Sequence, residues 1–484
     1  MSDLKDKNSF EAVIGLEVHV QLQTKSKVFS PDANKFGSEP NQHIHVISLG
    51  HPGSMPKLNK KALEYAIEMG LACHSEIGRY NFFDRKNYFY PDLPKGYQVT
   101  QDKTPICKGG YVEIGFDTNT PKKIMLHKIH MEEDAGKLMH VDGKDISAVD
   151  YNRAGVPLIE IVTDPMITSS QDAGAFLTEI RKMVRFLGIS DGHMEEGSLR
   201  CDANVSIRKK GVTTLGNKVE VKNLNSIRYV QKAIEVEIER QTNLTLQGKK
   251  IISETRLFDP EKNQTYGMRM KEELNDYRYF PEPDLAPFVV DDTMLDDIRK
   301  KMAKLPRQYY DDFTQKYGLP AYDALVITEK RDFAHLFEET VAHTTCYKQV
   351  SNWLMGPIKS YLKENGTSLR KLSLTGAMLA DLVNLVEKGT VSYTVACQNI
   401  FPEVIKTGKA PHDIAHDMNL VQESDSDVLM PVIKEVLAQN ADKVAMYKSG
   451  KKGLLGMFMG EVMKKTNGKA DPKLTNQLLV ESLA

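Results

Sequence analysis

The chain has 484 residues, enough for about three domains of roughly 100 to 200 residues each. Hydrophobic residues make up 41% and charged residues 27%, as in globular proteins, which excludes a disordered or fibrous chain. The 64 Lys and Arg residues nearly balance the 65 Asp and Glu residues, so binding of nucleic acid through overall positive charge is also excluded. Only local basic patches could bind it.

The five cysteines lie at least 34 positions apart, which fits neither a disulfide framework nor a CxxC metal site. No apolar run has the ~18 residues of a membrane span, and the first ten residues contain no apolar or arginine-rich targeting pattern. We therefore expect a cytoplasmic protein without a membrane segment.

Hydrophobic periodicity predicts the first elements of the chain. Apolar and polar residues alternate over residues 14–22, which indicates a strand with one buried face. Apolar residues then recur at helical spacing between a cap at Ser169 or Ser170 and a stop at Gly188. Alternation returns at residues 199–208 and 218–222. These strands have the pattern of one-sided antiparallel strands, so we predict an α+β fold.

Helical patterns dominate after residue 298, just beyond the proline-rich segment 276–287, which favours an extended connector. Near the end, charges separate: residues 410–442 hold seven acidic residues and one basic, and residues 443–473 hold eight lysines and two acidic residues. We predict a sheet-rich N-terminal domain with flanking helices (1–297), an all-α helical domain (298–409) and a small all-α tail domain (410–484).

Motifs that are missing narrow the chemistry. The sequence contains no GxxxxGK[ST] phosphate loop, no GxGxxG after a strand, no HExxH and no GxSxG. These absences disfavour the common nucleotide-binding and hydrolase folds. Glu17 and His19 share the polar face of the first predicted strand, about 7 Å apart. They could converge on one ion or simply face solvent.

Glu160 stands inside the otherwise apolar run VPLIEIV, where an unpaired carboxylate would cost several kcal/mol. It therefore needs a cation, either a metal ion or a nearby Arg or Lys. Acidic residues also crowd the segments HMEEDAGK (130–137) and MEEGSLRCDAN (194–204). Such runs are solvated turns unless they meet in space, where they would suit Mg2+ serving bound phosphates. His19 fits Mn2+ or Zn2+ better, so it could contact metal, substrate or only its neighbours.

Two further segments combine basic and aromatic residues. DRKNYFYPDLPKGYQ (84–98) either packs its aromatics in the core or forms a polar lining in which lysines contact carboxylates. The lysines near Tyr447 and Phe458 could follow a phosphate backbone or solvate a helix face.

Several of these segments together resemble the B subunit of the tRNA-dependent amidotransferases (the GatB family). They are VIGLEVHVQL, DRKNYFYPDLPKGYQ, LHKIHMEEDAGK, DYNRAGVPLIEIV, MEEGSLRCDANVSI, VEVKNLNS and DYRYFPEPD. NWLMG (352–356) and the basic C-terminal segment extend the resemblance to nearly the whole chain.

The resemblance implies a cradle-shaped N-terminal domain, a helical domain and a tail that contacts tRNA. It also implies an ATP- and Mg2+-dependent ligase that phosphorylates the side-chain carboxylate of Glu-tRNA(Gln) or Asp-tRNA(Asn). Ammonia from a partner glutaminase A subunit then displaces phosphate, and a small C subunit completes a heterotrimer. Acyl phosphate formation supplies the leaving group that a carboxylate lacks.

The resemblance also implies roles for single residues. The catalytic and metal residues would be Glu17, His19, Glu132 or Glu133, and Glu160. The cofactor-binding residues would be Glu195, Glu196, Arg200, Asp202 and Asn204. The ammonia path would include Lys86, Lys95 and Glu132. The tRNA-binding residues would be Lys451, Lys452, Lys464 and Lys465. Some relatives carry a cysteine zinc site, but the cysteine spacing here leaves no room for one, so we predict no structural zinc.

Two alternatives remain at this point. The chain could be a metal-dependent hydrolase that uses Glu17, His19 and Glu160 without ATP, or a tRNA-binding scaffold whose partners carry all catalysis. The setting of Glu160 argues against a scaffold, and ATP turnover would separate the alternatives.

Overall fold

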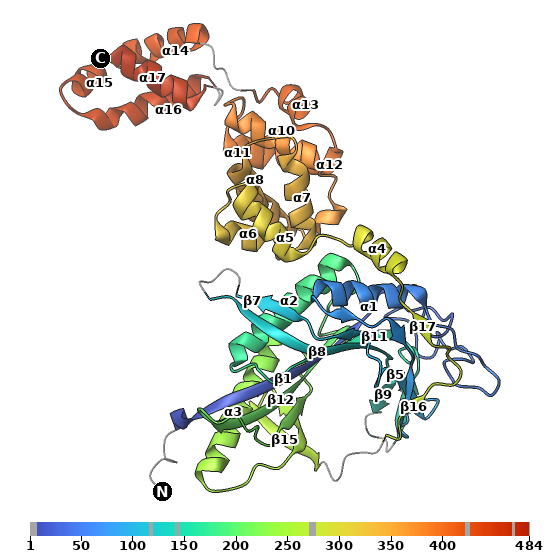
Figure 1. Ribbon diagram of the computed structural model, residues 1–484. Helices are drawn as coiled ribbons and strands as arrows, with labels where there is room; N and C mark the ends of the chain where they lie inside the picture. The colour runs from blue at the N-terminus through green and yellow to red at the C-terminus, as the bar shows by residue number, and fades with distance from the viewer. Residues whose placement is uncertain are drawn as a thin grey trace. The chain divides into compact units, whose positions relative to one another are not determined.

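The computed structural model describes residues 7–115, 120–140, 143, 146–270, 277–421, 426–466 and 470–483 (Figure 1). The chain divides into two compact units, Met1–Pro306 and Arg307–Ala484. The first unit is rich in strands and the second is helical, so the predicted α+β class is confirmed.

A ten-stranded sheet forms the centre of the first unit. Its strands follow in the order β15 (Gln264–Met270), β14 (Glu254–Asp259), β13 (Val219–Lys222), β12 (Leu199–Lys209), β1 (Phe10–Gln21), β11 (Pro157–Thr163), β8 (Lys122–Glu133), β6 (Cys107–Lys108) and β2 (Glu76–Ile77), and β7 (Tyr111–Ile114) also pairs with β8. The strands pair antiparallel except for β13 and β14, which are parallel. The long strand β1 lies near the middle and pairs with β11 on one side and β12 on the other.

Three helices cover one face of this sheet: α1 (Lys60–Ala72), α2 (Ser170–Leu187) and α3 (Ile227–Leu246). Leu16, Val18 and Val20 of β1 point into this layer and are fully buried. Because side chains alternate along a strand, Glu17 and His19 point to the other face. The helix predicted after residue 168 is α2, capped by the Ser169 hydroxyl and ended by left-handed Gly188 (φ 74°).

Smaller sheets extend the unit beyond the central one. Strands β4 (Asp84–Asn87), β5 (Tyr97–Thr100) and β16 (Phe280–Pro281) form one, β3 (Tyr80–Asn81) and β17 (Phe288–Val289) a second, and β9 (Lys137–His140) and β10 (Ser147–Asp150) a third. Of the proline-rich segment, Phe280–Pro281 forms the strand β16 and a turn follows at residues 283–284. Arg85 holds the segment through two 2.8 Å hydrogen bonds to Glu282. Its first residue, Asp276, lies outside the described residues.

The remaining elements are short helices. They are η1 (Lys7–Ser9) and α4 (Asp292–Lys301) in the first unit, and α5 (Pro306–Asp311), η2 (Asp312–Lys316), α6 (Ala321–Ile327), α7 (Arg331–Val341), α8 (Tyr347–Trp353), η3 (Leu354–Ile358), α9 (Lys359–Glu364), η4 (Leu369–Lys371), α10 (Gly376–Glu387), α11 (Tyr393–Val395), η5 (Ala396–Ile400), α12 (Phe401–Thr407), α13 (Pro411–Asp417), α14 (Ser426–Gln439), α15 (Ala441–Lys448), η6 (Lys452–Leu454), α16 (Leu455–Lys465) and α17 (Pro472–Leu483) after it. None of the described helices is long and apolar enough to span a bilayer.

The last helices, α14 to α17, share a core of their own, which includes Leu429, Ile433, Phe458 and Leu479. The tail helices thus have a core of their own within the second compact unit, while α4 contributes Leu295 and Ile298 to the core of the first unit. The expected domain boundaries at residues 297 and 409 remain predictions.

Candidate active site

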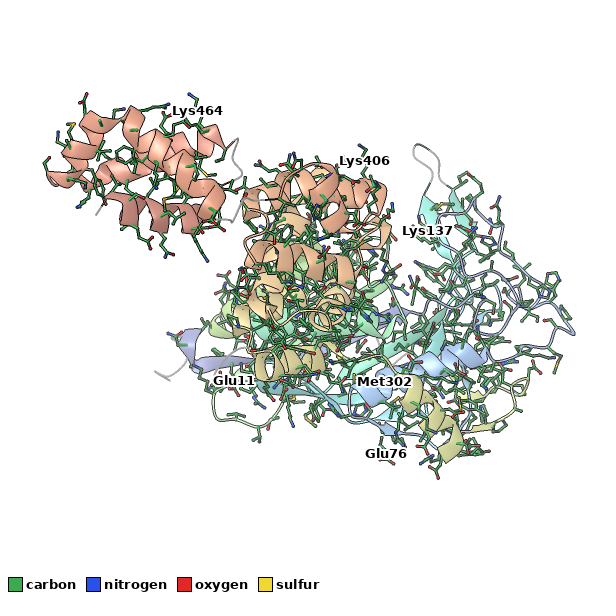
Figure 2. All side chains as sticks on the ribbon, turned by 90° about the horizontal axis from the view of Figure 1, so that it is seen from above. Glu11, Glu76, Lys137, Met302, Lys406 and Lys464 are labelled. Carbon is green, nitrogen blue, oxygen red and sulfur yellow. The ribbon has the colours of Figure 1, made fainter. Side chains whose placement is uncertain are left out.

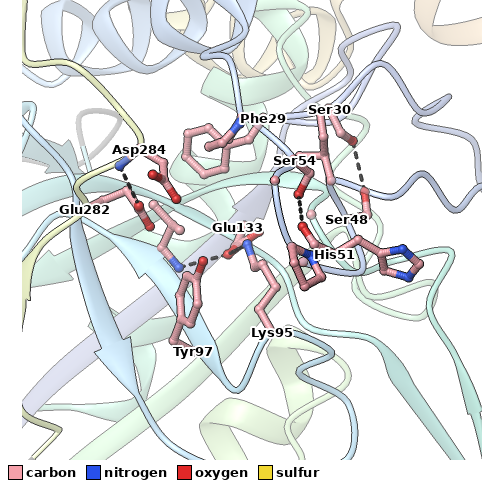
Figure 3. A pocket seen from close by; sticks show the side chains of 17 residues that line it. Phe29, Ser30, Ser48, His51, Ser54, Lys95, Tyr97, Glu133, Glu282 and Asp284 are labelled. Carbon is pink, nitrogen blue, oxygen red and sulfur yellow. Dashed lines mark hydrogen bonds and ion pairs between the residues drawn. The ribbon is translucent and has the colours of Figure 1, made fainter.

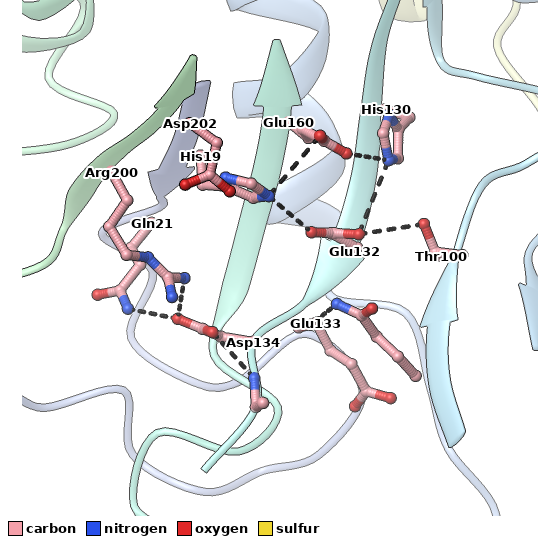
Figure 4. Close-up of polar contacts among 12 residues, drawn as sticks. His19, Gln21, Thr100, His130, Glu132, Glu133, Asp134, Glu160, Arg200 and Asp202 are labelled. Carbon is pink, nitrogen blue, oxygen red and sulfur yellow. Dashed lines mark hydrogen bonds and ion pairs between the residues drawn. The ribbon is translucent and has the colours of Figure 1, made fainter. Parts of the chain in front are cut away.

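The pairing of three neighbouring strands brings His19, Glu160 and His130 together. His19 of β1 lies directly opposite Glu160 of β11, and Glu160 lies directly opposite His130 of β8. Directly opposed residues point to the same side of a sheet. The three side chains therefore meet on the face that the helices leave open (Figure 4).

Glu132, two residues beyond His130, completes this first cluster. His19 Nε2 lies 3.7 Å from Glu132 Oε1 and 3.8 Å from Glu160 Oε1. His130 Nε2 lies 2.9 Å from Glu160 Oε2 and 3.7 Å from Glu132 Oε2. One ligand atom from each of His19, Glu132 and Glu160 lies within 4.8 Å of the others, which is close enough for one metal ion.

Glu160 has a cationic partner that the sequence did not reveal. Burial alone would raise the pKa of Glu160, but the hydrogen bond and charge of His130 lower this pKa well below its ordinary value, helped by His19 and Lys86. Burial opposes the charged form of His130, but Glu132 and Glu160 together raise the pKa of His130 to about 9. The cation expected beside Glu160 is thus a histidine of the neighbouring strand rather than an Arg or Lys.

A second cluster of carboxylates lies on the same face, formed by Glu17, Asp202 and Glu220 of β1, β12 and β13. One oxygen from each lies within 4.8 Å of the others. The Lys222 ammonium donates to Asp202 at 2.7 Å and lies 3.0 Å from Glu220. Burial, followed by the charges of Glu160 and Glu220, raises the pKa of Glu17, although Asn204 donates a 2.9 Å hydrogen bond to it. A bound cation would stabilise the ionised forms of the three carboxylates.

Glu133 does not belong to either cluster. Being adjacent to Glu132 in β8, it points to the opposite side, where its carboxylate accepts from the Lys95 ammonium and from Val99 N–H at 2.9 Å. Both charged side chains line an open pocket of about 190 Å³ with Tyr97 (Figure 3). The structure thus brings Glu132, and not Glu133, to His19 and Glu160, while the remaining expected ligand, Glu17, lies in the second cluster.

The five expected cofactor-binding residues do not lie together in the structure. Asp202 and Asn204 belong to the second cluster, and Arg200 donates to buried Asp134 at 2.7 Å. Glu195 and Glu196 are exposed in the turn before β12. Within the described chain, no hydrogen bond or ion pair joins these two to the clusters.

Of the expected ammonia-path residues, Lys86 and Glu132 face the first cluster, since the charge of Lys86 helps to lower the pKa of Glu160. The Lys86 ammonium also lies 4.8 Å from the ring centre of Tyr277. Lys95, paired with Glu133, lies at the pocket instead. The structure therefore places these residues in two groups.

The tail lysines are all exposed: Lys451, Lys452, Lys464 and Lys465. Lys465 pairs with Glu435 at 2.6 Å, and the Lys452 ammonium lies 4.2 Å from the ring centre of Tyr447. Lys464 projects from the surface of α16 (Figure 2). Another lysine of the basic segment, Lys469, lies outside the described residues.

Sequence reasoning missed His130, Glu220 and Asp134 as site residues. His130 and Glu132 differ by two positions, so alternation alone places them on one face. Glu220 likewise alternates with the buried residues of β13. What could not be seen is the pairing of strands far apart in sequence, and this pairing creates both clusters.

Comparisons with known proteins identify the family of this chain. Residues 12–296 match the model of the GatB/GatE catalytic domain, and residues 335–483 match that of the GatB domain. The first match covers more than half of the chain and includes nearly the whole central sheet, so the chain belongs to the GatB/GatE class.

Similar proteins narrow the assignment from this class to one family. The B subunit of the aspartyl/glutamyl-tRNA(Asn/Gln) amidotransferase of Thermodesulfovibrio yellowstonii is 48% identical over 474 residues, which are 98% of this chain and 99% of the relative. The corresponding proteins of Thermoanaerobacter pseudethanolicus (47%; 98% of this chain, 99% of the relative) and Trichodesmium erythraeum (48%; 99% and 98%) are similar over the same extent. The chain belongs to the family of aspartyl/glutamyl-tRNA(Asn/Gln) amidotransferase B subunits.

Proposed function

We propose that the open face of the sheet is where this chain activates the side-chain carboxylate of a misacylated tRNA. Members of its family are subunits of a glutamine-dependent and ATP-dependent ligase. This ligase converts Glu-tRNA(Gln) and Asp-tRNA(Asn) into Gln-tRNA(Gln) and Asn-tRNA(Asn). The observation that carries the proposal is the meeting of His19, Glu132 and Glu160 beside Glu17, Asp202 and Glu220 on one face.

The donor atoms of both clusters fit a divalent cation. The second cluster offers only carboxylate oxygens, the donors that Mg2+ prefers, whereas the first adds the imidazole of His19. Bound Mg2+ would offset the negative charge of the ATP phosphates during transfer. We propose no structural zinc, since the cysteines are widely spaced in the sequence and none belongs to either cluster.

The chain's own residues would organise the rest of the reaction. His130 holds Glu160, and Asn204 holds Glu17, so both carboxylates keep a fixed orientation before substrate arrives. Lys222 and Arg200 supply positive charge on the same face, where ATP phosphates would lie. Preorganised charge of this kind lowers the barrier because it need not reorient during the reaction. Nothing in the contacts of Glu195 and Glu196 supports a role for them in binding the cofactor.

The nitrogen source lies outside this chain. We propose that a glutaminase A subunit supplies ammonia and that a small C subunit joins the two, in the cytoplasm where aminoacyl-tRNA is used. Ammonia would pass Lys95 and Lys86 on its way to the first cluster. Both lysines are near carboxylates, Lys95 beside Glu133 and Lys86 close to Glu160, so both points on the proposed path are polar.

Replacing Glu160 with Gln tests the proposed function. Removing this charge should lower ATP-dependent phosphate release with Glu-tRNA(Gln) by roughly 100-fold or more. The affinity for tRNA should stay the same, because the tail is unchanged. Single-turnover assays with labelled ATP measure the first quantity and filter binding the second. Glu195→Gln is the matched control. Full activity of Glu160→Gln would refute the proposal, and so would hydrolysis of the aminoacyl-tRNA ester without ATP.

Lys86→Ala tests the ammonia path. Glutamine-driven amidation should fall more than amidation driven by added ammonium salt, because only the first needs guided delivery. Initial rates with the two nitrogen sources give the ratio, and Lys103→Ala in a nearby exposed loop is the control. Equal losses with both sources would instead place Lys86 in phosphoryl transfer or in the structure.

The third prediction concerns binding of aminoacyl-tRNA by the tail lysines. Lys→Gln changes at Lys451, Lys452 and Lys464 should raise the KM for aminoacyl-tRNA but not for ATP. Each lost phosphate contact should also flatten the dependence of log affinity on log salt by ~0.7 to 0.9. Lys→Gln changes at exposed Lys359 and Lys363 of α9, compared with the pair Lys451 and Lys452, provide a control with equal loss of charge. An unchanged salt slope and KM would show that the tail lysines only solvate their helices.

A further inference from the structure

The open face of the sheet continues past the two clusters to its edge strands β14 and β15. Glu17 lies opposite Asp202, and Lys222 of the next strand donates to Asp202 at 2.7 Å. Lys222 in turn lies opposite Leu257, and Leu257 opposite Tyr266. These five side chains form one cross-strand row that begins at the second carboxylate cluster.

The neighbours of Leu257 and Tyr266 confirm which way this row points. Thr265, next to Tyr266, donates to buried Glu237 of α3 at 3.1 Å, and Arg256, next to Leu257, donates to Thr265 at 2.9 Å. Arg256 and Thr265 therefore face the helical layer. Because side chains alternate, Leu257 and Tyr266 face the open side.

The chemical character changes along the row. It starts with carboxylates and the Lys222 ammonium and ends in apolar side chains that remain exposed: Leu257 (36%), Tyr266 (42%) and, one bulge away, Met268 (55%). The Tyr266 hydroxyl donates to Gln264 of its own strand at 3.2 Å, and the Lys262 ammonium lies 5.7 Å from its ring centre. Exposed aromatic rings on sheets, with basic side chains beside them, bind unstacked nucleobases.

The length of the cross-strand row matches the length of the aminoacyl-adenosine at the end of the tRNA. Three interstrand steps separate Asp202 from Tyr266, which is ~14 Å. This distance is comparable with that between the side-chain carboxylate and the base of an extended aminoacyl-adenosine. A carboxylate held near the clusters would therefore place the base near Tyr266.

We propose that Leu257 and Tyr266 form a stacking platform for the terminal base of aminoacyl-tRNA, which assumes the proposed function. ATP also carries an adenine, but β15 is the last strand of the sheet in the described chain. A polynucleotide continues beyond its last base over such an edge strand, whereas ATP ends at its adenine. Lys262 would meet the phosphate that precedes this base.

Variants at Tyr266 in the complete amidotransferase test the platform. Tyr266→Ala should raise the KM for Glu-tRNA(Gln) about ten-fold or more, since stacking on one aromatic ring is lost. Tyr266→Phe keeps the ring and should behave like wild type. The KM for ATP and the melting temperature should not change in either variant, nor any of these values in Tyr322→Ala, which removes an exposed tyrosine of α6.

Uncharged tRNA with and without its terminal adenosine, used as competing inhibitors, identifies the group that is bound. Removing the adenosine should weaken inhibition of the wild type by about the same factor, and should have little effect on Tyr266→Ala. Equal sensitivity of both proteins would overturn the proposal. So would a raised KM for ATP alone, which indicates an adenine nucleotide, or loss of co-purifying subunits, which indicates a protein interface. Failure of the wild type to amidate would instead refute the proposed function.

Discussion

A buried carboxylate that requires a cation is the constraint on which this site depends. Glu160 occupies the middle strand of the three that form the first cluster, and neighbouring groups leave only 15% of its side chain exposed. Leaving such a charge unpaired would cost several kcal/mol, more than most single contacts contribute to stability. His130 meets this need from one side and His19 approaches from the other. The result is a carboxylate held in one orientation before any substrate binds.

Strand alternation divides the chemistry between the two sides of β8. Glu132 and Glu133 are adjacent in sequence, yet Glu132 contacts both histidines of the cluster while Glu133 pairs with Lys95 at the pocket. A one-residue slip of β8 would exchange their positions and bring Glu133 instead of Glu132 to the histidines. Apolar side chains that alternate with His130 and Glu132, such as Met131, fix the register because they must enter the core.

The sequence allowed the local part of this arrangement to be predicted. Alternation placed Glu17 and His19 together, and the caps of α2 followed from Ser169 and Gly188. The need of Glu160 for a cation was also visible, but its partner was not, because β8 and β11 are neighbours only in the folded sheet. The same limit applies to Glu220, whose strand joins the cluster through β12. The pairing of strands that are far apart in the sequence is determined by packing of the whole core, so the pattern of a single segment cannot predict it.

The most direct test of the account compares Glu132→Gln with Glu133→Gln, two neutral substitutions of nearly equal size at adjacent positions. The measurement is single-turnover phosphate release from ATP with Glu-tRNA(Gln), with ammonium salt present so that ammonia delivery does not limit the reaction. The account predicts that Glu132→Gln loses phosphoryl transfer and that Glu133→Gln retains it. Retention by Glu132→Gln together with loss by Glu133→Gln would contradict the assignment of the reaction to the open face of the sheet.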